Sequence, residues 1–153
     1  MNNSKLVIAI GLLLVTAGLA AASEQTNVMA PVHQFMDGFN KGDVKTALAA
    51  CADQTSIIDE FAPFYWEGAG GCSAWAQAYE ADTKKNGVTE GHVTLSKATH
   101  VDIAGNRAYI VLPASYRFKQ RGKPVNEMGS TFTVVVTKGA AGWRITAWTW
   151  TKR

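Results

Sequence analysis

The stretch 56–68 places two adjacent acids, Asp59 and Glu60, beside four aromatic residues. A carboxyl group next to apolar surface either loses hydration when it ionises or keeps its proton. Such a group can transfer protons, anchor a ligand or simply accept a structural hydrogen bond from neighbouring backbone or from a Tyr or Trp donor. We interpret the stretch as the floor of a pocket, with Asp59 as the candidate general acid or base. Glu60 has the opposite parity on an extended strand and is predicted to face solvent.

The chain carries more Phe, Tyr and Trp residues than one small core needs. Tyr and Trp suit surfaces that are apolar but offer a polar handle. These aromatic residues could line a pocket for a flat apolar ligand or form a contact between subunits, and the sequence leaves both open. The residues predicted to wall a pocket with Asp59 are Tyr65, Trp66, Trp75, Tyr79 and Tyr116.

Residues 1–22 have the order of a secretory signal peptide. Lys5 precedes an apolar run, 6–19, and three alanines follow at 20–22. The run falls short of the roughly 20 residues that span a bilayer, so we predict cleavage before Ser23 and export to the periplasm or outside the cell. An uncleaved anchor is the alternative. After cleavage we expect no membrane partner.

Charge does not favour a nucleic-acid partner. The formal net charge is +3, and removal of Lys5 would lower it by one to +2. Acidic and basic residues are interspersed, whereas nucleic-acid surfaces gather Lys and Arg. Residues 23–153 have the length of a single domain.

The two cysteines, Cys51 and Cys72, are predicted to form a disulfide, because an even count in an exported protein favours pairing. A reactive thiol is the alternative, but neither cysteine has a nearby His in the sequence or stands in a CxxC pair.

No metal or cofactor is expected. His33, His92 and His100 are scattered, and the last two would lie eight residues apart on one predicted strand, too far for one ion. The sequence also lacks a phosphate-binding glycine loop and a nucleophile elbow.

Apolar spacing predicts three helices. The first covers about 25–40, the second follows Asp43 as its N-cap and extends to Cys51, and the third runs from Ser73 to Asn86. Pro31 is tolerable only in an opening turn.

Alternating patterns predict strands at about 55–60, 93–103, 108–118, 126–137 and 143–152, with an edge, turn or loop at 62–68. On the fourth of these strands Met128 would share a face with Phe132, Val134 and Val136. On the last, Arg144, Thr146, Trp148 and Trp150 would share one. Helices followed by an antiparallel meander make an α+β arrangement.

Four local patterns, in this order, are similar to one known superfamily. They are Phe39-Asn40-Lys41-Gly42-Asp43, Cys51-Ala52-Asp53, Trp66-Glu67-Gly68 and Gly142-Trp143-Arg144-Ile145. Together they resemble the nuclear transport factor 2-like superfamily, which includes the SnoaL-like cyclases and the ketosteroid isomerases. The resemblance implies a cone-shaped α+β fold, with three N-terminal helices on a strongly curved antiparallel sheet. It also implies a homodimer through the outer face of that sheet.

The resemblance also bears on the site. Asp59 stands where the steroid isomerases keep their general base, and Phe35 stands where they carry a tyrosine in the oxyanion hole. Their second acid would lie at 130–133, where this chain has no carboxylate. Without those donors an enolate would be poorly stabilised, so ketosteroid isomerisation is disfavoured. We also predict that Phe35 lines the pocket.

Three functions stay open. The first is a pocket for a small, largely apolar or aromatic molecule. The second is a cofactor-independent isomerase, cyclase or dehydratase that uses Asp59 for proton transfer. The third is a structural domain that acts through its dimer contact. A buried carboxyl group in an aromatic cavity would favour the first two, and a filled cone would favour the third.

Overall fold

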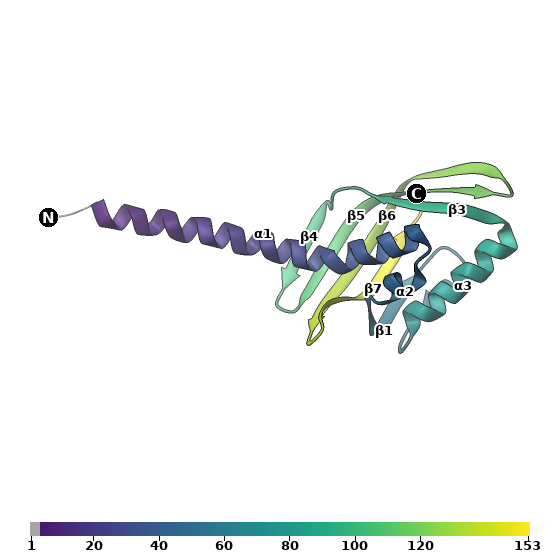
Figure 1. Ribbon diagram of the computed structural model, residues 1–153, viewed down its shortest axis with the longest axis horizontal. Coiled ribbons are helices and arrows are strands. Elements are labelled where there is room, and N and C mark those ends of the chain that lie inside the picture. The colour runs from purple at the N-terminus through teal and green to yellow at the C-terminus, as the bar shows by residue number, and fades with distance from the viewer. Residues whose placement is uncertain (1–3) are drawn as a thin grey trace.

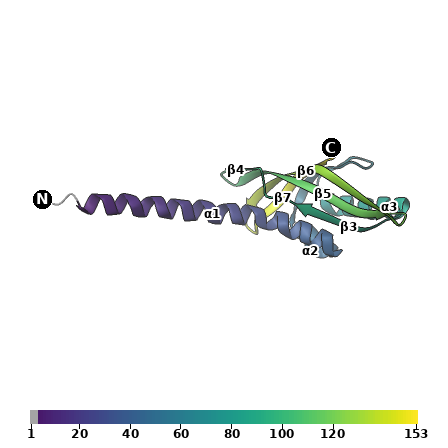
Figure 2. The same cartoon turned by 90° about the horizontal axis from the view of Figure 1, so that it is seen from above.

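The computed structural model describes residues 4–153, and within 4–22 it describes the helical backbone alone. Its helices are α1 (Ser4–Lys41), α2 (Val44–Leu48) and α3 (Gly71–Asn86). The later part of α1 lies across one face of a curved sheet, and α3 packs against β1 of the same sheet (Figures 1 and 2). The helix predicted at 25–40 is therefore the last part of a longer one. The predicted signal peptide falls on residues whose side chains lie outside the description, and it stays a prediction.

Pro31 lies inside α1 rather than in an opening turn. Because proline has no N–H, the carbonyl of Asn27 loses its helical partner there. Within the part of the chain whose side chains are described, no helix combines the length and apolarity needed to cross a membrane.

A tight corner joins α1 to α2. A Cβ atom on Gly38 would lie 2.5 Å from the backbone N of Ala47, so only glycine allows this approach. Asp43 caps α2 as predicted, since its Oδ1 accepts from the Thr46 N–H at 3.0 Å. The predicted extension of α2 to Cys51 is wrong, because the helix ends at Leu48 and Cys51 pairs in the sheet with Ile145.

Seven strands form one mixed sheet. They are β1 (Cys51–Ile58), β2 (Tyr65–Trp66), β3 (Val88–Leu95), β4 (His100–Ala104), β5 (Arg107–Gln120), β6 (Lys123–Gly139) and β7 (Gly142–Thr151). Their order is β2-β1-β7-β6-β5-β3, with β4 also paired to β5. The sheet is not wholly antiparallel, because β1 runs parallel to β7. These two strands are far apart in the sequence, so no hairpin fixes their relative direction.

The strand predicted at 93–103 is two strands. Both β3 and β4 pair with β5, but the segment 96–99 separates them. His92 and His100 therefore lie on different strands, β3 and β4. The prediction that they share one strand, which was used against a metal site, is wrong.

Two bulges reverse the predicted faces of β6 and β7. Gly129 has no partner between the pairs Ala114–Ser130 and Ser115–Met128, and its φ is 79°. Met128 consequently points outward and is 66% exposed, apart from the buried residues 132, 134 and 136. Bulges of this kind bend a strand and increase its twist.

On β7 the extra residue is Thr146, which lies between the pairs Val136–Ile145 and Val135–Ala147. Trp143 and Ile145 are therefore buried on the same side as Trp148. The prediction that Arg144 and Thr146 share a face with Trp148 and Trp150 is wrong, because a strand bulge shifts the alternation by one residue.

The core lies between α1 and the inner face of the sheet. Val32 and Phe35 of α1 are 0% and 2% exposed, and they meet the buried alternate residues of β5, β6 and β7. Between the bulges, each of these strands presents every second side chain to the helix.

The Cys51–Cys72 disulfide is confirmed, with a Cα–Cα distance of 6.5 Å. It ties the start of β1 to the first turn of α3. The two elements are in close contact there, since a Cβ atom on Gly71 would lie 2.5 Å from the carbonyl O of Thr55. α3 starts at Gly71, two residues before the predicted Ser73, and ends at Asn86 as predicted. Gly87 follows as its C-cap in the left-handed conformation.

The outer face of the sheet carries a ladder of half-buried Val and Thr side chains, including Val111, Thr133 and Thr149. Homodimerisation through this face stays a prediction. Light scattering at micromolar concentration is expected to give twice the mass of one chain, and the mass of a single chain would contradict it.

Candidate functional site

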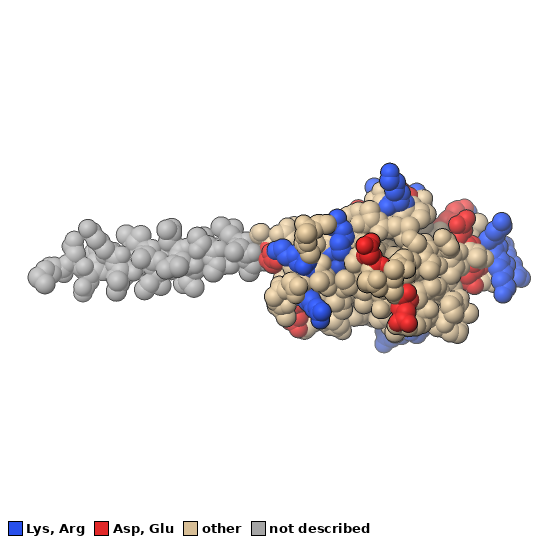
Figure 3. Space-filling model, turned by 90° about the horizontal axis from the view of Figure 1, so that it is seen from below, with Lys and Arg blue, Asp and Glu red and all other residues tan. Residues whose placement is uncertain are grey.

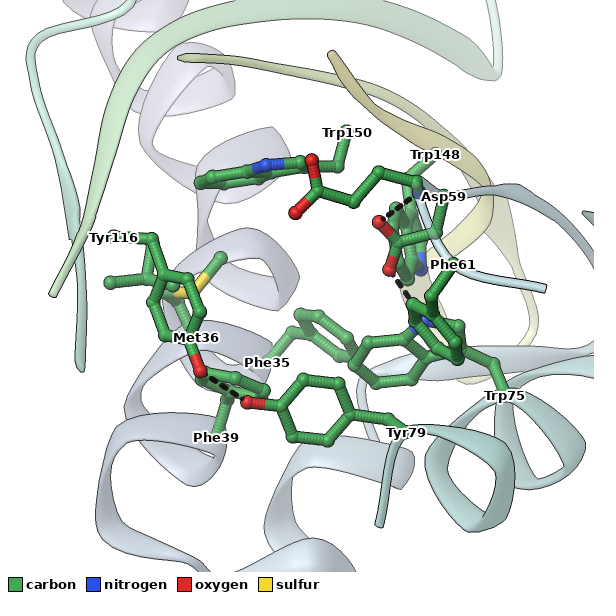
Figure 4. Close-up of a pocket in the computed structure, with 12 residues that line it drawn as sticks. Phe35, Met36, Phe39, Asp59, Phe61, Trp75, Tyr79, Tyr116, Trp148 and Trp150 are labelled. Atoms are coloured by element: carbon green, nitrogen blue, oxygen red, sulfur yellow. Dashed lines mark hydrogen bonds between the residues drawn. The ribbon is translucent and has the colours of Figure 1, made fainter. Parts of the chain in front are cut away.

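An apolar cavity of ≈70 Å³ lies between α1, α3 and the inner face of the sheet (Figure 4). Aromatic side chains form most of its wall, and two carboxyl groups and two aliphatic side chains complete it. The lining residues are Phe35, Met36, Phe39, Asp59, Glu60, Phe61, Trp75, Tyr79, Val93, Tyr116, Trp148 and Trp150. The cone is therefore not completely filled.

Five of the residues predicted for a pocket line this cavity. They are Phe35, Asp59, Trp75, Tyr79 and Tyr116. They come from α1, the segment after β1, α3 and β5, so only the tertiary fold brings them together (Figure 4).

Tyr65 and Trp66 do not line the cavity, which corrects their assignment. The chain reverses after β1, where the Asp59 N–H donates to the Phe64 carbonyl, and β2 then pairs back along β1. Trp66 becomes buried opposite Ile57, with its ring 5.0 Å from that of Phe61. Tyr65 is 48% exposed and donates to Glu67 instead.

Several lining residues were not predicted. They are Met36, Phe39, Glu60, Phe61, Val93, Trp148 and Trp150. Phe39 stands four residues after Phe35, so helical spacing already placed both on one face. Glu60 was predicted to face solvent and is exposed, but it also lines the cavity, because β1 ends at Ile58 and the strand alternation does not reach residue 60.

Asp59 is held by two hydrogen bonds. Its Oδ2 accepts from the Trp75 indole N–H at 2.8 Å, and its Oδ1 accepts from the Glu60 backbone N–H at 2.7 Å. Burial raises the pKa of Asp59, and these two donors partly oppose that rise. Asp59 thus has both of the predicted features: its carboxyl group accepts a structural hydrogen bond from a Trp donor, and the same group lines the cavity.

The hydroxyl groups of Tyr79 and Tyr116 lie 2.6 Å apart on the cavity wall (Figure 4). Burial raises the pKa of both, so both are protonated at neutral pH. In such a pair one hydroxyl donates to the other, which leaves one proton free for another acceptor. Gly91 makes room for this pair, since a Cβ atom there would lie 2.6 Å from the Tyr116 Oη.

Glu60 belongs to a small cluster of charges. The Lys152 Nζ lies 3.7 Å from its Oε2 and also contacts Glu127. Burial and the negative charge of Glu127 raise the pKa of Glu60, whereas Lys152 opposes the rise. Glu127 is 12% exposed, and its Oε2 has no hydrogen-bond partner among the described residues. This cluster has two acids for one lysine.

The volume of the cavity limits what it can hold. An engineered apolar cavity of about 150 Å³ accommodates benzene. At ≈70 Å³ this cavity takes only a small group, so a larger occupant would extend past Glu60, whose side chain is 34% exposed. Chemically, the site offers ring faces, one fixed carboxyl acceptor and one hydroxyl donor.

No family model and no curated protein matches this chain. Several solved structures do match this chain. An NTF2-like superfamily protein from Salmonella enterica aligns with a TM-score of 0.72 at 15% identity, over 86% of this chain and 92% of that one. An NTF2-like protein with a cystatin-like fold from Novosphingobium aromaticivorans gives 0.70 at 15% identity, over 90% and 87%.

A ketosteroid isomerase-like protein from Erwinia carotovora gives a TM-score of 0.65 at 14% identity, over 83% of this chain and 94% of that one. Identities this low carry the fold and leave activity undecided. The fold predicted by resemblance is confirmed.

Proposed function

We propose that this protein, which has the NTF2-like fold, binds a small, largely apolar molecule in its aromatic cavity. The observation that carries the proposal is the cavity wall, where eight aromatic rings surround a space that they do not fill. Binding sites are typically concave, mostly apolar, and equipped with a few polar groups that fix orientation. Asp59 and the Tyr79–Tyr116 pair are such groups.

The hydrogen bonds of the site support this proposal over a purely structural domain. A cavity that served only as core would be closed by packing, because protein interiors leave few voids larger than a water molecule. Here a desolvated carboxyl group is fixed by Trp75 beside open space, at a cost in solvation that core packing alone does not require.

A fluorescence titration tests binding, because Trp75, Trp148 and Trp150 line the cavity and report on its occupant. A panel of small aromatic and aliphatic compounds would be titrated against the full exported chain. We expect Trp150→Ala to weaken each hit about tenfold, as the loss of one aromatic contact implies.

The matched control is Tyr109→Ala, which removes a 45% exposed ring on β5 that lies outside the cavity lining. This variant should bind each hit as the unaltered protein does. Equal effects of the two substitutions, or a panel without any hit, would contradict the proposed site.

A second candidate function is proton transfer at carbon, which the placement of Asp59 and the tyrosine pair around one cavity favours. The Asp59 carboxylate would take a proton from a carbon next to a carbonyl group, and the C–H electrons would form an enolate. A tyrosine hydroxyl would donate to the enolate oxygen, and Asp59 would return the proton to carbon.

Hydrogen exchange in D₂O separates the two functions. An enzyme of this kind would exchange the acidic C–H of a bound ketone, as followed by NMR, and Asp59→Asn would abolish exchange while binding persists. Exchange at the uncatalysed rate in the presence of a bound ketone would leave binding as the function.

We further propose that the protein works after export. The Cys51–Cys72 disulfide supports this, because such bonds persist in oxidising compartments. The signal-peptide pattern of residues 1–22 supports it independently.

A further inference from the structure

The charged groups around the cavity are predominantly acidic. Among the described residues that line the cavity, Asp59 and Glu60 are the charged ones, and none is Lys, Arg or His. Glu127 adds a third carboxylate through its contact with Lys152, the lysine that also pairs with Glu60. Two carboxylates therefore contact one ammonium group, which is itself half exposed, and Asp59 adds a further acid on the cavity wall. A second cation would be attracted to this cavity.

The aromatic wall favours the same kind of occupant. The faces of Trp, Tyr and Phe rings carry negative charge density, and they attract cations within about 6 Å of the ring centre. Trp75, Trp148 and Tyr79 stand close together, with centroids 4.9 Å apart for the two tryptophans and 5.5 Å for Trp75 and Tyr79. Figure 4 shows Trp150, Tyr116 and Phe61 around the same space.

We propose that the occupant of this cavity carries an ammonium group, so that the ligand is a small organic cation. This inference rests on the proposed binding function and names its ligand class. The ammonium group enters the ≈70 Å³ space, where the free lone pairs of Asp59 and Glu60 accept its N–H bonds or balance its charge. The apolar remainder of the ligand lies at the mouth.

The cation is organic and not a metal ion. Across the described residues no three His, Cys, Asp or Glu side chains gather in a way that could hold a metal. Ring faces supply no ligand atoms for a hard cation, which prefers several oxygen atoms. They do complement the diffuse charge of an alkylated ammonium group.

Calorimetry with three compounds of similar shape tests the inference. The compounds are benzylammonium, benzyl alcohol and benzoate, each titrated at neutral pH into the full exported chain. We expect benzylammonium to bind at least tenfold more tightly than benzyl alcohol, and benzoate to bind most weakly. Glu60→Gln should remove most of that preference, because it should weaken the binding of benzylammonium far more than that of benzyl alcohol.

The control is Asp102→Asn, which removes one acid from β4, far along the sheet from the cavity lining. It lowers the negative charge equally, so an unchanged preference there shows that the local carboxylates act. Glu60 is the better test position, because Asp59→Asn also disturbs the bond to Trp75. Circular dichroism of each variant would verify the fold.

The outcomes separate the two proposals. Equal affinity for benzylammonium and benzyl alcohol, or a preference that survives Glu60→Gln, overturns the cation inference and leaves the apolar cavity in place. If none of the three compounds binds and the wider panel also gives no hit, the binding function fails and the cation inference fails with it.

Away from the cavity, charge is mixed. On the face drawn in Figure 3, Lys and Arg side chains are scattered among Asp and Glu side chains. The acidic excess is therefore a feature of the cavity and not of the surface as a whole, since the formal net charge of the chain is positive.

Discussion

Replacement of Phe132 by alanine is expected to lower the free energy of unfolding by about 4 kcal/mol. Phe132 lies in the middle of β6 and is 1% exposed. Its ring centroid is 5.5 Å from that of Trp148 and 6.3 Å from those of Phe35 and Trp150. Those three rings line the cavity and Phe132 does not, so the truncation would remove the support behind the wall.

Urea denaturation followed by circular dichroism measures this effect. Phe132→Leu is the control, because it retains most of the volume and should cost less than about 2 kcal/mol. Thr133→Ala changes the next residue, which faces the other side of the sheet, and should have little effect. A loss below about 1 kcal/mol for Phe132→Ala would contradict the prediction that this ring stabilises the core behind the cavity wall.

The same variant has a functional consequence. Loss of the ring enlarges the space behind Phe35 and Trp148, and a rigid core leaves part of that volume empty. We therefore expect Phe132→Ala, if it remains folded, to accept a larger apolar group than the unaltered protein does. The fluorescence panel used for the binding test would detect this change.

Loss of the Cys51–Cys72 disulfide is expected to lower the free energy of unfolding by about 3 kcal/mol. The bond joins residues 21 apart in the sequence, and in the chain-entropy model the released loop enlarges the unfolded ensemble by that amount. Structurally, it joins β1, which precedes Asp59, to α3, which carries Trp75. Its loss should therefore loosen the Asp59–Trp75 contact as well.

Thermal unfolding with and without a reducing agent measures this effect. The control is the double variant Cys51→Ala and Cys72→Ala, whose melting temperature should not respond to the reductant. An equal response of both proteins would show that the reductant acts elsewhere. A melting temperature that is unchanged when the disulfide is lost would contradict its stabilising role.

Local patterns were sufficient for much of the fold. Helical spacing predicted the part of α1 that packs on the sheet, the Asp43 cap predicted the start of α2, and Gly87 predicted the end of α3. These features depend on backbone geometry within a few residues, which residue type controls directly. The positions of β5, β6 and β7 were also predictable, because alternation persists over many residues.

The errors concern which way side chains face. Met128 was predicted to share a face with Phe132, Val134 and Val136, but it points to the other side and is 66% exposed. Glu60 is exposed as predicted, yet it also lines the cavity. A single extra residue at Gly129 shifts the alternation of β6, and the end of β1 at Ile58 removes it before residue 60. The bulge has no clear local signature, because glycine is common in turns as well as in bulges. The residues after Ile58 do not mark the end of β1 clearly either.

The sequence by itself determined most of the elements, the cysteine pairing and the presence of an acid among aromatic residues. Only the tertiary structure decided that Trp148 and Trp150 join Asp59 while Trp66 packs behind Phe61. That choice depends on the register between strands that are far apart in the sequence, β1 against β7 above all. A shift of one residue in register moves every side chain to the opposite face, and no local pattern specifies it.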